Sequence, residues 1–321
     1  WWKRAVKIWN AWFAWGKKSA RKFFKQRKDT KRHKKNMAIV YALCCLIFSA
    51  LNHFIFKLYA RRVRSRGMFV FWVGICFFLV LIWLPRDSTA SLPATLFWGV
   101  LSGFFSVTGN ILLIEAMGMQ SAGLCSTIYR LNLVLVVPGA ILLLGESLNA
   151  RQGIGIVAAL GAILAFMPGK EERNSVTSRK PMLGFYLVLL AAVLRACMGL
   201  SYKYAFTHGA DKNSVTVLNA LMWIGGGLLY ASSWEKKISF KDGAVLKYGI
   251  LSGIFVTAIV FFMAAMLHIP DGAASIVLPI AQMSFLLTFI LGVIFLKEKI
   301  SKRKIAALLC GCAAILLLIA K

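Results

Sequence analysis

Long apolar stretches alternate with short polar segments along the chain from residue 37 onward. Ten windows have about the 20 residues that an α-helix needs to cross a bilayer, and few charges. They are 38–58, 68–85, 94–117, 122–144, 150–168, 183–206, 213–232, 244–267, 273–296 and 302–320. The pattern predicts an all-α integral membrane protein with ten transmembrane helices.

The ten windows fall into two sets of five that resemble each other. The segment 99–105, GVLSGFF, matches 249–255, GILSGIF, and the same alignment pairs Leu144, Glu146 and Asn149 with Leu296, Glu298 and Ser301. Asn149 and Ser301 precede the last helix of each set, where we expect them to cap it. The sequence therefore predicts two five-helix repeats, 37–168 and 182–321, joined by a polar linker, 169–181.

An odd number of spans in each repeat forces the second repeat to enter the membrane from the opposite side. The two repeats are then inverted relative to each other. Inverted repeats are typical of carriers that work by alternating access, with the substrate site between the halves near the middle of the bilayer.

The first 36 residues differ from the rest of the chain. They contain five of the ten tryptophans and a run of lysines and arginines whose spacing predicts a basic amphipathic helix on an anionic membrane surface. The alternative is that residues 1–36 are not native sequence, because the first methionine is Met37 and a clean apolar span follows it.

Composition excludes a soluble protein, since 59% of the 321 residues are hydrophobic, 16% are charged and the mean hydropathy is +0.72. The net charge of +28 does not indicate nucleic-acid binding, because fourteen of the 39 lysines and arginines lie before Met37 and most others flank apolar spans. The seven cysteines all lie in apolar stretches and lack the spacing of a metal site. We expect no metal and no cofactor.

Three ionisable residues lie within predicted spans, where charge is costly and usually functional. They are Glu115, Arg130 and Arg195, and the equivalent positions of the other repeat hold Ala265, Gln282 and Ser49. One hypothesis is a structural salt bridge between Glu115 and Arg130. The other is that the two arginines hold an anionic group of the substrate while Glu115 exchanges a proton or releases Arg130. The surplus of positive charge favours an anionic or zwitterionic solute.

Polar residues on the spans are further candidates for the site, although such residues more often form hydrogen bonds between helices than bind a ligand. These candidates are Asn52, His53, Asn110, Asn132 and Gln282. Pro138 and Pro279 are expected to bend the fourth and ninth helices, and because they do not align, the bends are expected to differ between the repeats.

Two segments carry a family resemblance. The stretch 126–137, STIYRLNLVLVV, followed by Leu144-Gly-Glu146, and the stretch 274–284, ASIVLPIAQMS, followed by Leu296-Lys-Glu298, resemble the two copies of the EamA domain of the drug/metabolite transporter superfamily. The resemblance covers Met37 to Lys321. It implies a ten-helix basket in the bacterial inner membrane with cytoplasmic termini, and it says little about the substrate.

The expected function is a secondary transporter, most simply an exporter, of a small polar metabolite, acting as a monomer or homodimer in the lipid bilayer. A flippase for a lipid intermediate is the alternative on the same scaffold. A membrane-embedded lipid-modifying enzyme is disfavoured because the four histidines are scattered and no loop is long enough for an active site.

Loop charge argues against the orientation that the resemblance implies. From Met37 on, basic residues concentrate in the loops 57–66, 170–180, 235–247 and 297–304, which lie on one side of the predicted topology. The positive-inside rule would place that side, and not the termini, in the cytoplasm.

Overall fold

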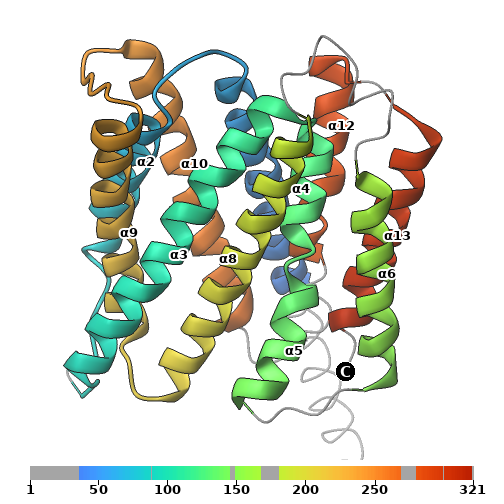
Figure 1. The fold of residues 1–321 in the computed structure, drawn as a ribbon. Helices are drawn as coiled ribbons and strands as arrows, with labels where there is room; N and C mark the ends of the chain where they lie inside the picture. Colours follow the sequence, from blue (N-terminus) through green and yellow to red (C-terminus); the bar gives the residue numbers. More distant parts are fainter. Residues whose placement is uncertain are drawn as a thin grey trace, which may run out of the picture.

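A computed structural model of the protein describes residues 36–87, 89–144, 149–167, 181–268, 280–298 and 300–319. The predicted amphipathic segment 1–36 and the linker 169–181 lie outside these residues, apart from their last positions. The described residues form helices and turns without strands (Figure 1). Their helices are Asn36–Ala60, α2 (Arg66–Leu81), α3 (Leu92–Met119), α4 (Ala122–Arg130), α5 (Leu133–Leu144), α6 (Ala150–Phe166), α8 (Pro181–Thr207), α9 (Lys212–Leu229), the π-helical turn η1 (Tyr230–Trp234), α10 (Gly243–His268), Ile280–Leu296, of which α12 is Ser284–Leu296, and α13 (Lys302–Ile319).

Every apolar window of the sequence contains a helix. Within the described parts of the chain, six helical segments are long and apolar enough to cross a membrane: Asn36–Ala60, Leu92–Met119, Ala122–Gly139, Pro181–Thr207, Lys212–Trp234 and Gly243–Met263. Three more apolar helices are shorter, and α13 begins with three basic residues. The structure therefore supports a multi-pass membrane protein, while the number of helices that cross the bilayer is not fixed by helix length.

Helix starts follow local sequence. Asn149 caps α6 in a capping box, since its side chain accepts from Gln152 N and its own N–H donates to the Gln152 side chain. Ser301 accepts from Lys304 N at the start of α13. Both predicted caps are confirmed.

The duplicated glycine motif has one structural role in both repeats. A Cβ on Gly99 of α3 would lie 2.5 Å from Leu218 of α9, and a Cβ on Gly249 of α10 would lie 2.5 Å from Trp72 of α2. Gly103 likewise meets Met222 of α9, and Gly253 meets Cys76 of α2. The third helix of each repeat thus packs closely on the second helix of the other repeat through its small residues.

We name the two ends of the helical bundle after a residue at each, the Arg66 end and the Asp211 end. At the Arg66 end, Glu235 accepts hydrogen bonds from Ser65 Oγ and, at 2.7 Å, from Arg66 N at the start of α2. At the Asp211 end, Asp211 N donates to Thr95 Oγ1 at 3.0 Å and Ser91 N donates to Gly209 O at 2.9 Å. Contacts between the two repeats therefore hold the loops together at both ends.

The α3–α4 turn lies at the Arg66 end and is held by two charges. Lys57 Nζ donates to Met117 O and Gln120 O at the carboxyl end of α3, and Glu298 Oε1 accepts from Ala122 N at the start of α4. A cation at a helix carboxyl end and a carboxylate at a helix amino end both interact favourably with the helix dipole.

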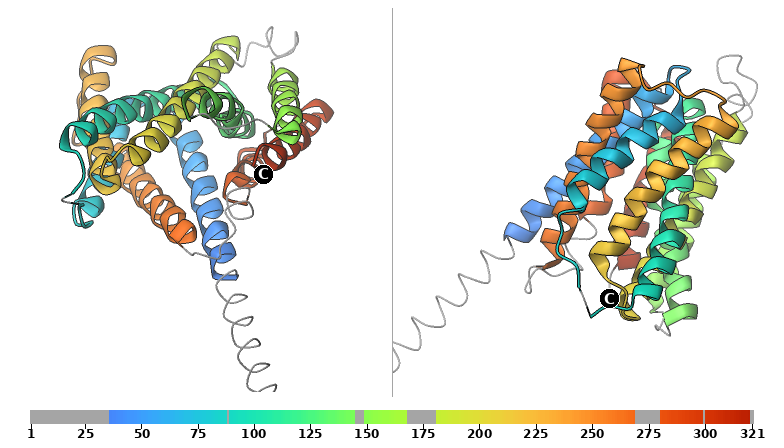
Figure 2. Two further views of the ribbon diagram at one scale, coloured as in Figure 1. Left: turned by 90° about the horizontal axis from the view of Figure 1, so that it is seen from below. Right: turned by 90° about the vertical axis from the view of Figure 1, so that its left-hand side faces the viewer.

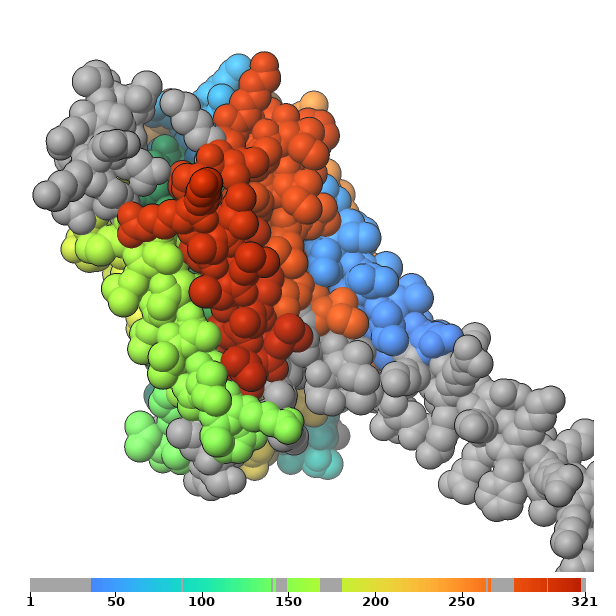
Figure 3. Space-filling view, turned by 90° about the vertical axis from the view of Figure 1, so that its right-hand side faces the viewer, coloured from blue at the N-terminus to red at the C-terminus, as the bar shows by residue number. Residues whose placement is uncertain are grey.

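The hydrophobic core consists of one large cluster towards the Arg66 end and several smaller ones. The large cluster joins helix Asn36–Ala60, α2, α3, α4, α8 and α9. A separate cluster joins the α4–α5 region to α6, α12 and α13. Near Asp211, one cluster pairs α2 with α9, a second joins α3, α8 and α9, and a third joins helix Asn36–Ala60 to α10 and Ile280–Leu296. Seen from below, helix Asn36–Ala60, in blue, stands between α10 and α12–α13 (Figure 2). On the outside, α6 and α13 lie side by side (Figure 3).

Candidate functional site

Two helices are interrupted at equivalent positions of the two repeats. The chain turns at Leu131 (φ −75°, ψ 6°), between α4 and α5, and at Met283 (φ −70°, ψ 6°), just before α12. Around both residues the same short-range bonds occur: Leu131 N to Ile128 O and Val134 N to Leu131 O in one repeat, Met283 N to Ile280 O and Leu286 N to Met283 O in the other.

The expected proline bends differ from these breaks. Pro138 lies inside α5, about two turns beyond Leu131, and Pro279 lies outside the described residues. The breaks are equivalent in the two repeats, whereas bends at the prolines would not be. A local turn of i to i+3 hydrogen bonds, with no proline at its centre, interrupts each helix.

Arg130 and Gln282 occupy equivalent positions beside these breaks and are in contact. Arg130 Nη1 donates to Gln282 Oε1 at 3.1 Å, and the Arg130 side chain is buried with 8% of its residue surface exposed. The two residues come from different repeats, so this hydrogen bond marks the point where the two broken helices meet.

Arg195 and His53 lie around the same point. The Arg195 guanidinium is 5.9 Å from the centre of the Tyr129 ring, within cation–π range, and its Nη1 contacts Met198 Sδ at 3.4 Å. The His53 ring meets the Tyr129 ring edge-on at 5.7 Å. Tyr129 therefore links a histidine and an arginine contributed by different repeats.

Several buried polar atoms near this point have no hydrogen-bond partner among the described residues. They are Ser49 Oγ, His53 Nδ1, Arg130 Nε and Ser284 Oγ. Ser49 and His53 are one turn apart on helix Asn36–Ala60, and Thr288, one turn beyond Ser284, contacts Ala50 O of that helix. Unpartnered buried polar groups are costly, so their concentration at one place indicates a site for a ligand or water.

The charge at this central site is positive. No described carboxylate lies within ion-pair distance of Arg130 or Arg195, whose contacts are with an amide, a thioether and an aromatic ring. Two buried or half-buried guanidinium groups without a counter-ion favour a negatively charged ligand. No group of three or more metal-ligating side chains occurs in the described part of the chain.

Glu115 lies away from this site. Its Oε1 forms an ion pair with Arg66 Nε at 3.2 Å and accepts from the Tyr230 hydroxyl at 3.1 Å. The carboxylate thus contacts Arg66 of α2 and Tyr230 of the π-helical turn, and it makes no ion pair with Arg130 among the described residues. The interpretation of Glu115 and Arg130 as a buried pair is therefore not what the structure contains.

The remaining predicted site residues have varied surroundings. Asn52 accepts from Ser252 Oγ of α10 at 2.6 Å, and Asn110 Nδ2 donates to Ser106 O of its own helix at 2.8 Å, so both serve contacts within the bundle. Asn132 is half-buried at the α4–α5 break, next to Leu131. Of the eight predicted residues, the structure gathers Arg130, Gln282, Arg195 and His53.

Three further residues of the site were missing from the sequence-based prediction: Ser49, Tyr129 and Ser284. The repeat alignment offered a signal for two of them, because Ser49 is equivalent to Arg195 and Ser284 to Asn132. A position that faces the centre in one repeat is expected to face it in the other.

Comparison with known proteins bears on this arrangement. The model of the EamA-like transporter family matches residues 36–167 and 182–320. A solved structure described only as "Crystal structure of protein" is 15% identical, covers 88% of this chain and 96% of its own, and has a TM-score of 0.56, which shows a similar fold. A search of curated proteins found no match.

Proposed function

Because the chain belongs to the EamA-like transporter family, we propose that it is a secondary active transporter, an exporter of a small anionic or zwitterionic metabolite. In this proposal ten helices cross the membrane as two inverted five-helix repeats, 37–168 and 182–321, and the substrate binds between them. The mechanism is alternating access, in which the two halves rock around a fixed central site.

The contact between Arg130 and Gln282 carries this proposal. It joins equivalent breaks of the two repeats, and irregular backbone at membrane depth is tolerated where it lines a cavity or is buried in protein. The unpartnered atoms of Ser49, His53 and Ser284 surround it. These groups offer hydrogen bonds to a polar solute inside an otherwise apolar bundle.

The preference for an anion rests on the two arginines. In the sequence-based interpretation Glu115 offset one of them, but its carboxylate pairs with Arg66. The central site then has two positive charges and no described acid. We assign Arg130 and Arg195 to the anionic group, with Gln282, His53, Asn132 and the two serines as hydrogen-bonding neighbours.

The division of the core supports a carrier in one of its two end states. The largest cluster lies towards the Arg66 end and joins helices of both repeats, whereas the clusters at the Asp211 end are smaller. We assign this conformation to a state closed at the Arg66 end. Glu235 and Glu298, which hold starts of helices in the other repeat, are the contacts that must be released when this end opens.

For localisation we propose the bacterial inner membrane with cytoplasmic termini, as the family resemblance implies, and a monomer or homodimer. Loop charge from Met37 on argues for the opposite orientation. Reporter fusions at the carboxyl terminus and in the 235–242 loop decide between the two, because each reporter is active on one side of the membrane only.

Ligand-induced thermal stabilisation tests the proposed substrate class. The full chain and its Arg130→Gln, Arg195→Gln and Arg151→Gln variants are titrated with carboxylates, phosphates, amino acids, sugars and cationic drugs, since a ligand that binds the folded state raises the unfolding temperature. Arg151 is exposed at the start of α6 and serves as the matched control. The compound that stabilises the wild-type chain is then used for counterflow in proteoliposomes.

We expect an anionic or zwitterionic compound to stabilise the wild-type chain and Arg151→Gln but neither central variant. Equal stabilisation of all four proteins by a cation contradicts the assignment of the arginines. A stabilising anion that produces no counterflow contradicts transport itself. Stabilisation by a lipid-linked sugar or phosphate instead favours the flippase.

A further inference from the structure

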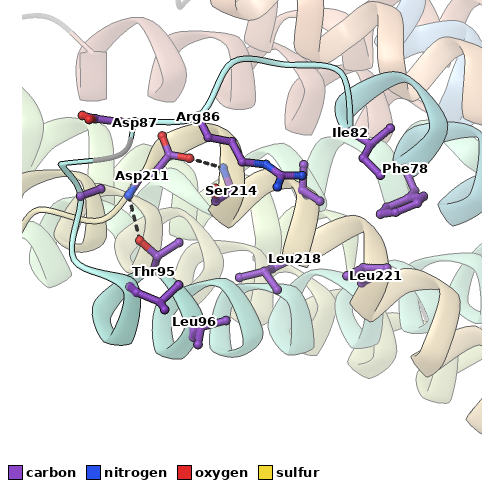
Figure 4. A pocket seen from close by; sticks show the side chains of 13 residues that line it. Phe78, Ile82, Arg86, Asp87, Thr95, Leu96, Asp211, Ser214, Leu218 and Leu221 are labelled. Atoms are coloured by element: carbon purple, nitrogen blue, oxygen red, sulfur yellow. Dashed lines mark hydrogen bonds between the residues drawn. The ribbon is translucent and has the colours of Figure 1, made fainter.

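A second site lies away from the centre, at the Asp211 end. A cavity of about 530 Å³ is lined by the end of α2, the loop that follows it, the start of α3 and the first half of α9 (Figure 4). Its volume is in the range of sites for small molecules and cofactors. None of the residues of the central site lines it.

The polarity of the cavity changes along its length. Arg86, Asp87 and Asp211 form a charged rim at the Asp211 end of the bundle, whereas Phe78, Leu218 and Leu221 form apolar walls further along α2 and α9. A phospholipid has the same order of polarity along the membrane normal, with a charged headgroup above an apolar chain.

The rim combines one guanidinium, that of Arg86, with two carboxylates, those of Asp87 and Asp211. The carboxylate of Asp87 accepts from the Thr89 hydroxyl at 2.6 Å and from Thr89 N at 2.9 Å, and that of Asp211 accepts from Ser214 N at 2.7 Å. Arg86 is exposed, and its guanidinium makes no hydrogen bond or ion pair with the described residues. In Figure 4 its side chain extends past Ser214 into the space above α9.

The surroundings place this rim at the depth of lipid headgroups. Trp83, which lies in the loop that follows α2, is 86% exposed, and Leu92 at the start of α3 is 68% exposed. Exposed tryptophan is enriched at the membrane–water interface, and exposed leucine at a helix start suits contact with lipid.

The cavity is separated from the central site by tightly packed helices. Gly99 and Gly103 of α3 are in direct contact with Leu218 and Met222 of α9, which leaves no passage between these two helices. A molecule bound in the cavity would reach it from the surrounding lipid and would contact both repeats, since α2 and α3 belong to one and α9 to the other.

We propose that this cavity binds a zwitterionic membrane phospholipid, with the headgroup phosphate on Arg86, the headgroup cation beside Asp87 and Asp211, and an acyl chain along Phe78, Leu218 and Leu221. Arginine binds phosphate through charge-assisted hydrogen bonds, and the apolar walls gain from covering a chain. The site is independent of the proposed transport cycle, because it needs only that the chain lies in a membrane.

Native mass spectrometry of the delipidated full chain tests this site. The protein is titrated with a zwitterionic diacyl phospholipid, with diacylglycerol of the same chains and with inorganic phosphate. The variants are Arg86→Gln, which removes the rim charge, Leu221→Trp, which fills the cavity, and Arg151→Gln, an exposed arginine at the same end but outside the cavity.

We expect the phospholipid to bind the wild-type chain and Arg151→Gln equally and to bind Arg86→Gln and Leu221→Trp about tenfold more weakly. Diacylglycerol is expected to bind the wild-type chain as weakly as the phospholipid binds Arg86→Gln. Equal phospholipid binding by all four proteins overturns the proposal, because the lipid is then only part of the general lipid belt. Equally tight binding of inorganic phosphate overturns it as well, because the acyl chain then contributes nothing.

Discussion

The carboxylate of Glu298 accepts a hydrogen bond from the backbone N–H of Ala122 at 2.7 Å, although 176 residues separate them in the chain. The bond ties the loop after α12 to the start of α4 in the other repeat. Glu298 therefore acts as a capping residue for a helix of which it is not part.

Replacement of Glu298 by alanine is expected to lower stability by about 1 kcal/mol, the usual cost of a lost helix cap. Glu298→Gln keeps an acceptor oxygen and loses only the charge interaction with the helix dipole, so its effect is expected to be smaller. Thermal unfolding in detergent measures both. The exposed Lys302→Gln, in the same segment, is the control, and an equal effect of all three changes would contradict the capping role.

Two glycines of α9 are expected to respond oppositely to alanine. A Cβ on Gly227 would lie 2.6 Å from Phe71 N of α2, whereas a Cβ on Gly225 has nothing within 4 Å. Gly227→Ala forces the two backbones apart and is expected to cost about 1–3 kcal/mol. Gly225→Ala is expected to stabilise the helix by about 0.5 kcal/mol. Thermal unfolding of the two variants checks the difference, and equal midpoints would show that α2 and α9 are not in close contact.

The equivalence of Arg130 and Gln282 predicts a partial rescue. Arg130→Gln is expected to weaken binding of the stabilising anion about tenfold or more, because it removes a charged hydrogen-bond donor. The double variant Arg130→Gln with Gln282→Arg places the guanidinium at the equivalent position of the other repeat and is expected to recover part of the affinity. Titrations by thermal shift measure both, and a double variant as weak as the single one would refute the equivalence.

Glu115 is expected to matter for stability and not for substrate binding. Glu115→Gln leaves Arg66, which is 18% exposed, without its counter-ion and is expected to cost about 1–3 kcal/mol. Tyr230→Phe removes only one hydrogen bond to the same carboxylate, at about 1 kcal/mol. Anion affinity measured at a temperature where both variants are folded should match the wild-type chain. If the Glu115→Gln variant alone binds the anion more weakly than the wild-type chain, Glu115 belongs to the substrate site.

Asp211 is expected to give the protein acid-sensitive stability. Burial raises the pKa of its carboxyl, but hydrogen bonds from Ser214 and neighbouring backbone N–H groups outweigh it, so the pKa lies below the ordinary value of 3.8. A folded-state pKa below the unfolded value stabilises the protein above pH 3.8, and this contribution is lost as the pH falls through the folded-state value. The unfolding temperatures of the wild-type chain and Asp211→Ala should therefore differ most near neutral pH and converge below pH 3.8. A difference in unfolding temperature that grows at acidic pH would contradict this prediction.

The sequence was sufficient for the helices and their caps because these depend on local patterns. Apolar windows and residues such as Asn149 act within a few positions of where they stand. The helix breaks were harder to predict, since Leu131 and Met283 carry no proline or glycine signal and Pro138 pointed elsewhere. The alignment of the two repeats offered a signal for the breaks, because it places Arg130 and Gln282 at equivalent positions.

The partner of Glu115 was not predictable in this way. Spacing along the chain brought Glu115 and Arg130 within reach of each other across one short turn. The actual partners, Arg66 and Tyr230, reach Glu115 only through the packing of α2 and α9 against α3. Arg66 belongs to the same repeat as Glu115 and Tyr230 to the other, and no local pattern encodes which face of α3 meets either of them.

Among the labelled helices, the most extensive contacts all join one repeat to the other, including α3 with α8, α6 with α13, and α2 with both α9 and α10. Among the same helices, contacts within a repeat, such as that of α2 with α3, are much less extensive. Most of the contact between these helices is therefore made only when both repeats are present. The two repeats therefore resemble the subunits of an obligate dimer that are joined in one chain. We expect the protein to unfold in a single step, and we expect two separately expressed halves to be stable only together.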